Sequence, residues 1–504
     1  MNLWQGVAPD HLILLSMVIP FIGSQLVIAT GKIPNLREAV TLTTSVLLFT
    51  VVLAITDHTF KGNTLALNVI ELFPGLGISF LVEPLGVLFA LVASFLWIIT
   101  TIYAIGYMRG HNEENQTRFF FCFALAISSV MAICFSGNLL TLFIFYEVLT
   151  LSTYPLVTHA GNDAAKKGGR VYLGILLSTS IAFLFLAIIG TWSITGTLDF
   201  KPGGVFDESH DKTMLSVLLV LFCYGIGKAA IMPFHRWLPA AMVAPTPVSA
   251  LLHAVAVVKA GVFSILKVVI YIFGIDELDN LAATDIMLYI GAATILLSSC
   301  IAITKDNLKA RLAYSTISQL SYIVVGALLA SSIAAAGSAL HIATHAVGKI
   351  TLFFCAGAIM VASHKKNISE MVGLGRQMPI TMIAFGIGAI SIIGLPPMAG
   401  TWSKWFLTIG ALESDKLIIV AVLMISSLLN IAYLLPIPIK AFFNTQTKEQ
   451  QPWTWSETKE APLPSLIAIG VTSIGCVVLF FYPQPLIDLI NLIPGISTNL
   501  NGEG

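Results

Sequence analysis

The stretch GKAAIMPFHRWLP, residues 227–239, places a lysine and two prolines within a long apolar region. A charged side chain at bilayer depth costs about 3 kcal/mol or more, so it persists mainly where it faces a protein interior or a water-filled path. Pro233 removes a helix hydrogen bond and breaks the span. The stretch therefore predicts a broken transmembrane helix with a buried cation, Lys228, at the break.

A second stretch, GLPPMAGTWSKW at residues 394–405, repeats this combination. Pro396 and Pro397 interrupt the span, and Lys404 follows. Proline-broken helices at corresponding positions of two halves are typical of inverted-repeat transporters, whose ion sites lie near the bilayer midplane at the breaks. The two stretches predict two inverted five-helix repeats, made of spans 4–8 and 9–13.

The composition of the 504-residue chain indicates a membrane protein. Hydrophobic residues make up 57% and charged residues only 10%, whereas a soluble domain carries about 25% charged residues. The net charge of zero gives no reason to expect a nucleic-acid partner. The six cysteines are scattered without CxxC spacing, so we expect no disulfide framework, metal site or other cofactor.

Windows of about twenty residues predict fourteen transmembrane helices, and the fold class is an all-α polytopic membrane protein. The first apolar run lacks a preceding basic segment and a cleavage site, so it is expected to be a retained helix. The predicted spans are 11–30, 39–57, 79–107, 117–136, 138–160, 171–195, 213–233, 247–273, 284–304, 312–331, 335–362, 379–411, 417–443 and 464–486. The predicted domains are 1–110 for helices 1–3, 111–275 and 276–445 for the two repeats, and 446–504 for helix 14 and the tail.

Basic residues are distributed unevenly between the two sets of loops. Of the 26 lysines and arginines, 17 lie in one set of loops, four in the other and five within spans. Positive loops face the cytoplasm, so both termini are predicted on the outer side of a cell (inner) membrane.

Five lysines and one glutamate lie inside the predicted spans and suggest an ion or proton route. They are Glu147, Lys228, Lys259, Lys267, Lys349 and Lys404. For Glu147, a structural ion pair to a neighbouring helix is the alternative. Lys267 lies late in its span, where its long stem could instead reach the membrane surface.

Histidines accompany two of these lysines. His341, His345 and Lys349 follow an i, i+4, i+8 pattern and share one helix face, which favours a proton wire over ordinary helix–helix hydrogen bonding. His253 lies six residues before Lys259, about 240° around an unbroken helix, so a local distortion near Pro245 or a bridging water would be needed to bring them together. Polar residues such as Ser315 and Thr344 are candidates to bind bridging waters, or to join helices.

Several motifs together resemble one known family across spans 4 to 13. They are FYEVLTLS at 145–152, residues 228–239 followed by APTPVSALLH at 244–253, Lys259, HAVGK at 345–349, and the Lys404 motif. These are similar to the proton-conducting antiporter family. It comprises the large subunits of Mrp-type cation/proton antiporters and the antiporter-like subunits of respiratory complex I and membrane-bound hydrogenases.

The resemblance implies a subunit of a larger membrane complex that moves protons. Glu147 would control how readily Lys228 gives up its proton, transfer would continue through Lys259 and the His345/Lys349 stripe, and Lys404 would be the exit. It favours the D-type subunit of an Mrp sodium/proton antiporter, a secondary transporter and not an enzyme, because Lys404 stands where one complex I subunit carries glutamate and the chain ends soon after span 14. The alternatives are a proton-pumping subunit of complex I or a hydrogenase, and a purely structural scaffold, which the retained charges disfavour.

Overall fold

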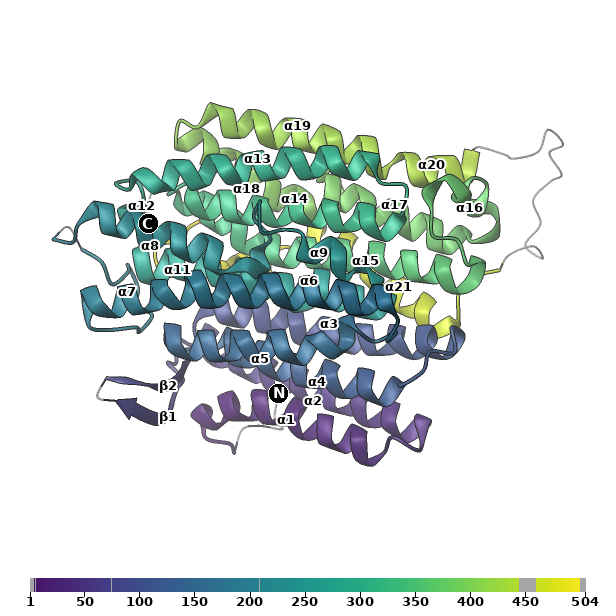
Figure 1. Ribbon diagram of the computed structural model, residues 1–504, viewed down its shortest axis with the longest axis horizontal. Helices are drawn as coiled ribbons and strands as arrows, with labels where there is room; N and C mark the ends of the chain where they lie inside the picture. Colours follow the sequence, from purple (N-terminus) through teal and green to yellow (C-terminus); the bar gives the residue numbers. More distant parts are fainter. Residues whose placement is uncertain (1–3, 5, 74, 208, 444–458, 499–504) are drawn as a thin grey trace.

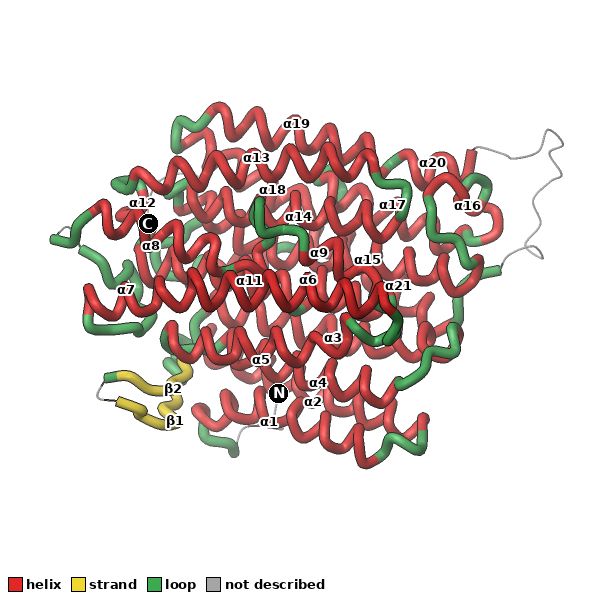
Figure 2. The backbone as a smooth tube through the Cα atoms, viewed as in Figure 1, coloured by secondary structure: helices red, strands yellow, loops and turns green. Residues whose placement is uncertain are grey.

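The computed structural model describes residues 4, 6–73, 75–207, 209–443 and 459–498, without the side chains of 73, 252 and 253. Helices that run along one common direction form most of the molecule, and a small two-stranded hairpin lies at one end (Figures 1 and 2). The helical, multi-pass architecture agrees with the predicted fold class.

The N-terminal part consists of α1 (Pro9–Ala29), α2 (Pro34–Phe60) and α3 (Pro84–Gly110), each with a proline in its first turn. Proline suits this position because its missing N–H has no helical partner there. The hairpin of β1 (Ala66–Phe73) and β2 (Leu76–Leu81) was not predicted, and it replaces the first residues of the third predicted span. That helix begins only at Pro84.

The region predicted as the first repeat contains several interrupted helices. Its elements are α4 (Gln116–Cys134), α5 (Leu139–Val157), α6 (Asp163–Thr179), the π-helix η2 (Ser180–Leu184), α7 (Phe185–Thr195), α8 (Lys212–Gly225), the 3₁₀ turn η3 (Gly227–Ala229), α9 (Trp237–Ala240), η4 (Ala241–Val243), α10 (Thr246–Ala250), the π-helix η5 (Leu251–Val255), α11 (Val257–Val268) and the π-helix η6 (Val269–Phe273). The seventh predicted span is therefore broken, as the sequence indicates.

The second half is arranged around α15 (Ser332–Ser363), which is 32 residues long and packs against α3, α14, α17, α18 and α21. The other elements are α12 (Ile275–Leu278), α13 (Ala282–Thr304), α14 (Leu308–Leu328), η7 (Ile368–Met371), α16 (Leu374–Gln377), α17 (Pro379–Ile393), α18 (Gly400–Glu413), α19 (Leu417–Leu434), α20 (Pro436–Phe443), α21 (Leu463–Phe481) and α22 (Gln484–Ile490). The twelfth predicted span is broken between α17 and α18.

Within the described residues, ten helices are long and apolar enough to cross a membrane, and α8 and α17 are shorter apolar helices. The predicted count of fourteen is therefore not confirmed. The difference arises partly because proline breaks and π-helices divide several predicted spans into shorter pieces.

Loops rich in basic residues meet at one end of the bundle. A cavity of about 460 Å³ there is lined by His111, Asn162, Lys309 and Lys365, which come from loops and helix ends far apart in the sequence. At the other end, the Ala66 N–H donates to the side chain of Asp10, and the Ser497 N–H donates to Ser332 at the start of α15. The start of α1 and Ser497, near the C-terminus, therefore lie opposite the basic loops, whereas Trp4, the first described residue, contacts Thr50 partway along α2. Which end faces outward stays a prediction.

Candidate functional site

Lys228 lies in η3, where the chain leaves the helical path after α8. Its side chain is fully buried, and its Nζ donates to Thr150 Oγ1 at 2.6 Å and to the Tyr146 carbonyl oxygen at 2.8 Å. The same Nζ lies 3.1 Å from the centre of the Tyr146 ring. The ammonium group is therefore held by α5 through hydrogen bonds and a cation–π contact.

Glu147 lies on the same helix α5, next to Tyr146. Both of its carboxylate oxygens are buried, and neither has a hydrogen-bond partner within the described part of the chain. Among the described residues it forms no direct ion pair with Lys228, which bonds to Tyr146 and Thr150 instead. A buried carboxylate without a partner is costly, so Glu147 is a strong candidate for a functional role.

The broken segment at Lys228 lies against α11, which carries Lys259. A Cβ atom on Gly261 would come within 2.4 Å of the backbone at Lys228 and Ala229. Only glycine allows this approach, because any side chain would collide with the neighbouring main chain. This close packing places the backbone of Lys228 against Gly261 of α11, which is two residues from Lys259.

Lys259 connects the two halves of the molecule. Its Nζ lies 2.8 Å from Nδ1 of His345, on α15. Both side chains are buried. At this distance the two groups share a hydrogen bond, so the predicted first and second repeats meet at a buried lysine–histidine pair.

The histidine pair continues along α15. The rings of His345 and His341 stack with their centres 5.6 Å apart, and His341 Nδ1 lies 2.8 Å from Ser403 Oγ on α18. Lys349 is turned toward α14, where its Nζ donates to Ser315 Oγ at 2.8 Å. All five side chains are buried, so the i, i+4, i+8 stripe divides into a histidine line and a lysine branch.

Lys404 follows Ser403 at the second helix break. Its Nζ donates to the carbonyl oxygen of Ile393 at 3.0 Å. Ile393 is the last residue of α17, whose end leaves carbonyl groups without helical partners. The Nζ also lies 4.8 Å from the centre of the Tyr322 ring, and this ring stacks on His341. The break at Pro396 and Pro397 therefore supplies a polar group for the lysine.

The structure separates Lys267 from this line. Its Nζ lies 2.8 Å from Glu83 Oε2 and donates to the Ser136 carbonyl oxygen at 2.6 Å. The Lys267 side chain is 0% exposed. The alternative that its stem reaches the membrane surface is therefore wrong, because a second carboxylate, missed in the sequence, neutralises it inside the protein.

Of the two alternatives for His253, a local helix distortion or a bridging water, the structure contains a distortion, the π-helix η5, and α11 begins at Val257. The side chain of His253 lies outside the described residues, so its relation to Lys259 stays a prediction. Pro245 precedes α10 directly and fits the start of that short helix. Pro233 lies in the irregular segment between η3 and α9.

Four partners of the buried lysines and histidines were not predicted from the sequence: Tyr146, Thr150, Tyr322 and Ser403. Tyr146 and Thr150 lie within the FYEVLTLS motif at 145–152, and Ser403 is adjacent to Lys404. Proximity to the motifs could have suggested three of them. Tyr322 comes from a different helix, and nothing in its local sequence identifies it.

The site as a whole is a line of buried groups that can hold or pass protons. Direct contacts run from Lys259 through His345 and His341 to Ser403, and Tyr322 contacts both His341 and Lys404. No cluster of three or more His, Cys, Asp or Glu side chains suited to a metal ion occurs among the described residues. The chemistry available is proton exchange between nitrogen and oxygen groups.

These features define a multi-pass membrane subunit of the antiporter-like class. A model described as "NADH:quinone oxidoreductase/Mrp antiporter, TM" matches residues 136–430, and one described as "NADH-Ubiquinone oxidoreductase (complex I), chain 5 N-terminus" matches 75–120. The chain belongs to the NADH:quinone oxidoreductase/Mrp antiporter transmembrane family.

Related sequences are subunits of NADH- and NAD(P)H-quinone oxidoreductases. The chain is 30% identical to NADH-quinone oxidoreductase subunit N of Desulforudis audaxviator, over 95% of this chain and 97% of that protein. It is 33% identical to NAD(P)H-quinone oxidoreductase subunit 5 of Paulinella chromatophora, over 65% of this chain, but it spans only half the length of that relative.

Solved structures share the fold. A chain of the Mrp complex from Dietzia sp. DQ12-45-1b superposes with a TM-score of 0.85 at 20% identity and covers 98% of each chain. A chain of the membrane-bound sulfane sulfur reductase, an archaeal respiratory membrane complex, superposes with a TM-score of 0.83 at 20% identity, covering 97% of this chain and 98% of that one.

Proposed function

We propose that this chain is the proton-translocating subunit of a multisubunit Mrp-type cation/proton antiporter. The observation that carries the proposal is the 2.8 Å contact between Lys259 Nζ and His345 Nδ1, which joins the two halves of the line. Groups within hydrogen-bond distance can pass a proton directly. Its partners are other membrane subunits, protons and a monovalent cation such as Na⁺.

Protons enter near Glu147 and Lys228, pass Lys259 and the His345/Lys349 region, and leave at Lys404. Glu147 has no direct partner among the described residues, so it can approach or withdraw from Lys228 without breaking a hydrogen bond. A nearby carboxylate favours the charged ammonium, and its withdrawal favours proton release. This coupling lets one helix movement drive one proton step.

A second candidate function is a proton-pumping subunit of a complex I-like oxidoreductase. The 30% identity to subunit N over nearly the full length of both chains favours it. The two functions differ in the energy source. In the first, the gradient of one ion drives movement of the other in exchange. In the second, electron transfer drives proton pumping.

The test uses everted vesicles that carry the complete complex, with a fluorescent reporter of the pH gradient. Wild type, Lys228→Ala, Glu147→Ala and the control Lys61→Ala are compared after addition of Na⁺, K⁺ or Li⁺. Lys61 is an exposed residue paired with Asp57, so its loss should not affect transport. We expect cation-dependent proton movement in wild type and the control, and its loss in the other two variants.

Two other outcomes would change the assignment. Proton movement driven by an electron donor and by no cation would establish the oxidoreductase function. Full transport by Lys228→Ala and Glu147→Ala, at normal protein levels, would exclude the buried line as the proton path.

A further inference from the structure

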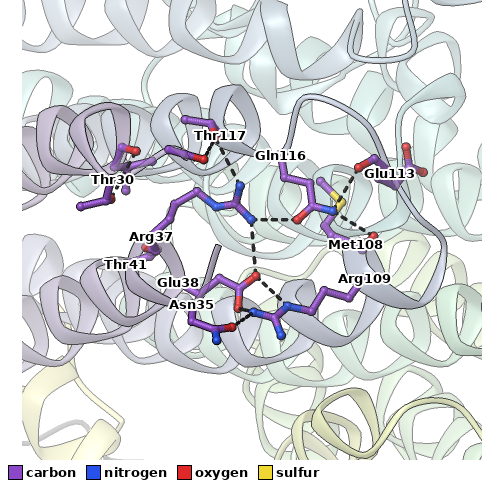
Figure 3. A network of polar contacts seen from close by, with 12 residues as sticks. Thr30, Asn35, Arg37, Glu38, Thr41, Met108, Arg109, Glu113, Gln116 and Thr117 are labelled. Atoms are coloured by element: carbon purple, nitrogen blue, oxygen red, sulfur yellow. Dashed lines mark hydrogen bonds and ion pairs between the residues drawn. The ribbon is translucent and has the colours of Figure 1, made fainter. Parts of the chain in front are cut away.

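A polar cluster lies where α2, α3 and α4 meet, at the end of the bundle that carries the basic loops (Figure 3). Arg109 donates from Nε to Glu38 Oε1 at 3.0 Å and from Nη2 to Glu38 Oε2 at 2.5 Å. Arg37 donates from Nη2 to the same carboxylate at 3.4 Å and to Gln116 Oε1 at 2.8 Å. Two guanidinium groups share one carboxylate, so these three side chains together carry one net positive charge; the Glu113 carboxylate, which belongs to the same network, lies 3.1 Å from His111 Nδ1.

An open cavity of about 460 Å³ adjoins this cluster. It is lined by Ile33, Pro34, Asn35, Arg109, Asn112 and Gln116. The Arg109 side chain is 47% exposed, whereas that of Glu38 is 6% exposed, so the arginine faces the cavity and the carboxylate stays inside.

The cavity offers hydrogen-bond donors without matching acceptors. Arg109 Nη1 and the Nδ2 groups of Asn35 and Asn112 make no hydrogen bond within the described part of the chain, while Asn35 Oδ1 already accepts from Arg109 at 2.6 Å. A guanidinium group beside amide donors is the arrangement that recognises phosphate oxygens. The geometry therefore fits a phosphate group.

An apolar surface lies directly beside these donors. Ile33 and Leu36, at the start of α2, are 56% and 46% exposed, and Leu26 and Ile28, at the end of α1, are 47% and 53% exposed. Both helices lie at the outer edge of the bundle (Figure 1). In a membrane protein, exposed aliphatic side chains at the outer edge contact acyl chains. A polar cavity next to such a surface suits an amphiphile more than a free ion.

We propose that this cavity binds the phosphate headgroup of an anionic phospholipid, with the acyl chains along the exposed face of α1 and α2. Basic pockets between transmembrane helices are suited to such headgroups. The lipid would supply the negative charge that Glu38 alone does not provide for Arg37 and Arg109. The site is built from different residues than the proton line, so lipid binding and proton transfer can be measured separately.

The test measures lipid retained by the purified complete complex, using native mass spectrometry. Phosphatidylglycerol and phosphatidylcholine of the same acyl composition are titrated separately, and inorganic phosphate is added as a competitor. The variants are Arg109→Gln, Arg109→Lys and Asn35→Ala, the last of which leaves the Arg109–Glu38 pair intact. The control is Arg170→Gln, an exposed arginine on α6 outside the cavity.

We expect at least about tenfold tighter retention of phosphatidylglycerol than of phosphatidylcholine in wild type and the control. Arg109→Gln should lose most of this preference, and Arg109→Lys should keep part of it, because lysine retains the charge without the fork. Asn35→Ala should weaken retention of both lipids, because it removes an amide donor to the phosphate but no charge. Equal retention of both lipids, or an equal loss in Arg170→Gln, would overturn the proposal. Binding of inorganic phosphate with no preference for the anionic lipid would overturn the lipid assignment and identify a free-phosphate site.

Discussion

Each buried lysine is held by a different set of neighbours, and these sets distinguish Lys267 from the other four lysines. Lys228, Lys259, Lys349 and Lys404 bond to neutral groups: hydroxyls, carbonyl oxygens and a histidine. Lys267 pairs with a carboxylate, Glu83, at 2.8 Å. A lysine among neutral partners can lose its proton without leaving an unpaired buried carboxylate, whereas deprotonation of Lys267 would strand Glu83.

Because Lys267 pairs with Glu83 and not with the histidines or the other lysines, we predict that breaking this ion pair lowers the stability of the protein without directly affecting proton transport. Glu83→Gln leaves Lys267 as an uncompensated buried charge, which should lower the free energy of unfolding by about 3–5 kcal/mol. The double variant Glu83→Gln/Lys267→Met should recover most of this loss, because it removes both charges. Denaturation of the detergent-purified protein measures the effect, with the exposed hairpin residue Glu71→Gln as the control. Equal stability of the single and double variants would contradict an ion-pair role.

At the scale of secondary-structure elements, the helix breaks position the buried lysines of the candidate site. The break after α8 places η3 against α11, and the break between α17 and α18 frees the carbonyl oxygen of Ile393 for Lys404. The π-helix η5 lies directly before the helix that carries Lys259. Irregular backbone at membrane depth is tolerated where it is enclosed by protein, and here it is found beside the buried lysines.

A substitution at Gly261 tests whether the close contact between η3 and α11 is required. Gly261→Ala would place a methyl group 2.4 Å from the backbone at Ala229, so η3 and α11 must separate. We expect a loss of about 1–3 kcal/mol of stability and a large decrease in proton transport, because Lys228 moves away from α11. Thermal unfolding and vesicle transport measure both effects.

The matched control is Gly174→Ala on α6, where an added Cβ meets nothing within 4 Å. It should leave stability and transport unchanged or slightly raise stability, since alanine favours helix. Similar losses in both glycine variants would contradict the close-approach argument.

At the scale of the whole molecule, the two halves share a central line, and the two ends of the bundle differ in charge. Basic side chains such as Lys309, Lys365 and Lys366 meet around one cavity, and the start of α1 and Ser497 lie at the opposite end. Lys201 lies near that opposite end, where its N–H donates to the Tyr271 carbonyl oxygen at 3.1 Å. The distribution allows a direct test of orientation.

The positive-inside rule predicts that Lys365 faces the cytoplasm and Lys201 the outside. A membrane-impermeant maleimide should therefore label Lys365→Cys only in everted vesicles and Lys201→Cys only in intact cells. Both variants carry Cys300→Ser, because Cys300 is the exposed cysteine among the six free ones, and this parent variant is the control. The reverse labelling pattern would invert the predicted topology.

The class of the protein, the helix breaks and the buried lysines could be predicted from the amino-acid sequence. Hydropathy, proline chemistry and charge cost act on each residue through its neighbours along the chain, so Pro233, Lys228 and the histidine spacing on α15 could be interpreted without a structure. It also indicated a distortion near His253, although it missed the hairpin before α3 and overestimated how continuous the spans are.

Only the tertiary structure decided which partners these residues have. The contacts of Lys228 with Tyr146, Lys259 with His345, and Lys267 with Glu83 join residues 82, 86 and 184 positions apart. Such contacts depend on how helices pack against one another, which the local sequence pattern does not specify. The same packing turns Lys349 away from the two histidines on the same helix α15, and among the described residues it leaves Glu147 without a direct contact to Lys228.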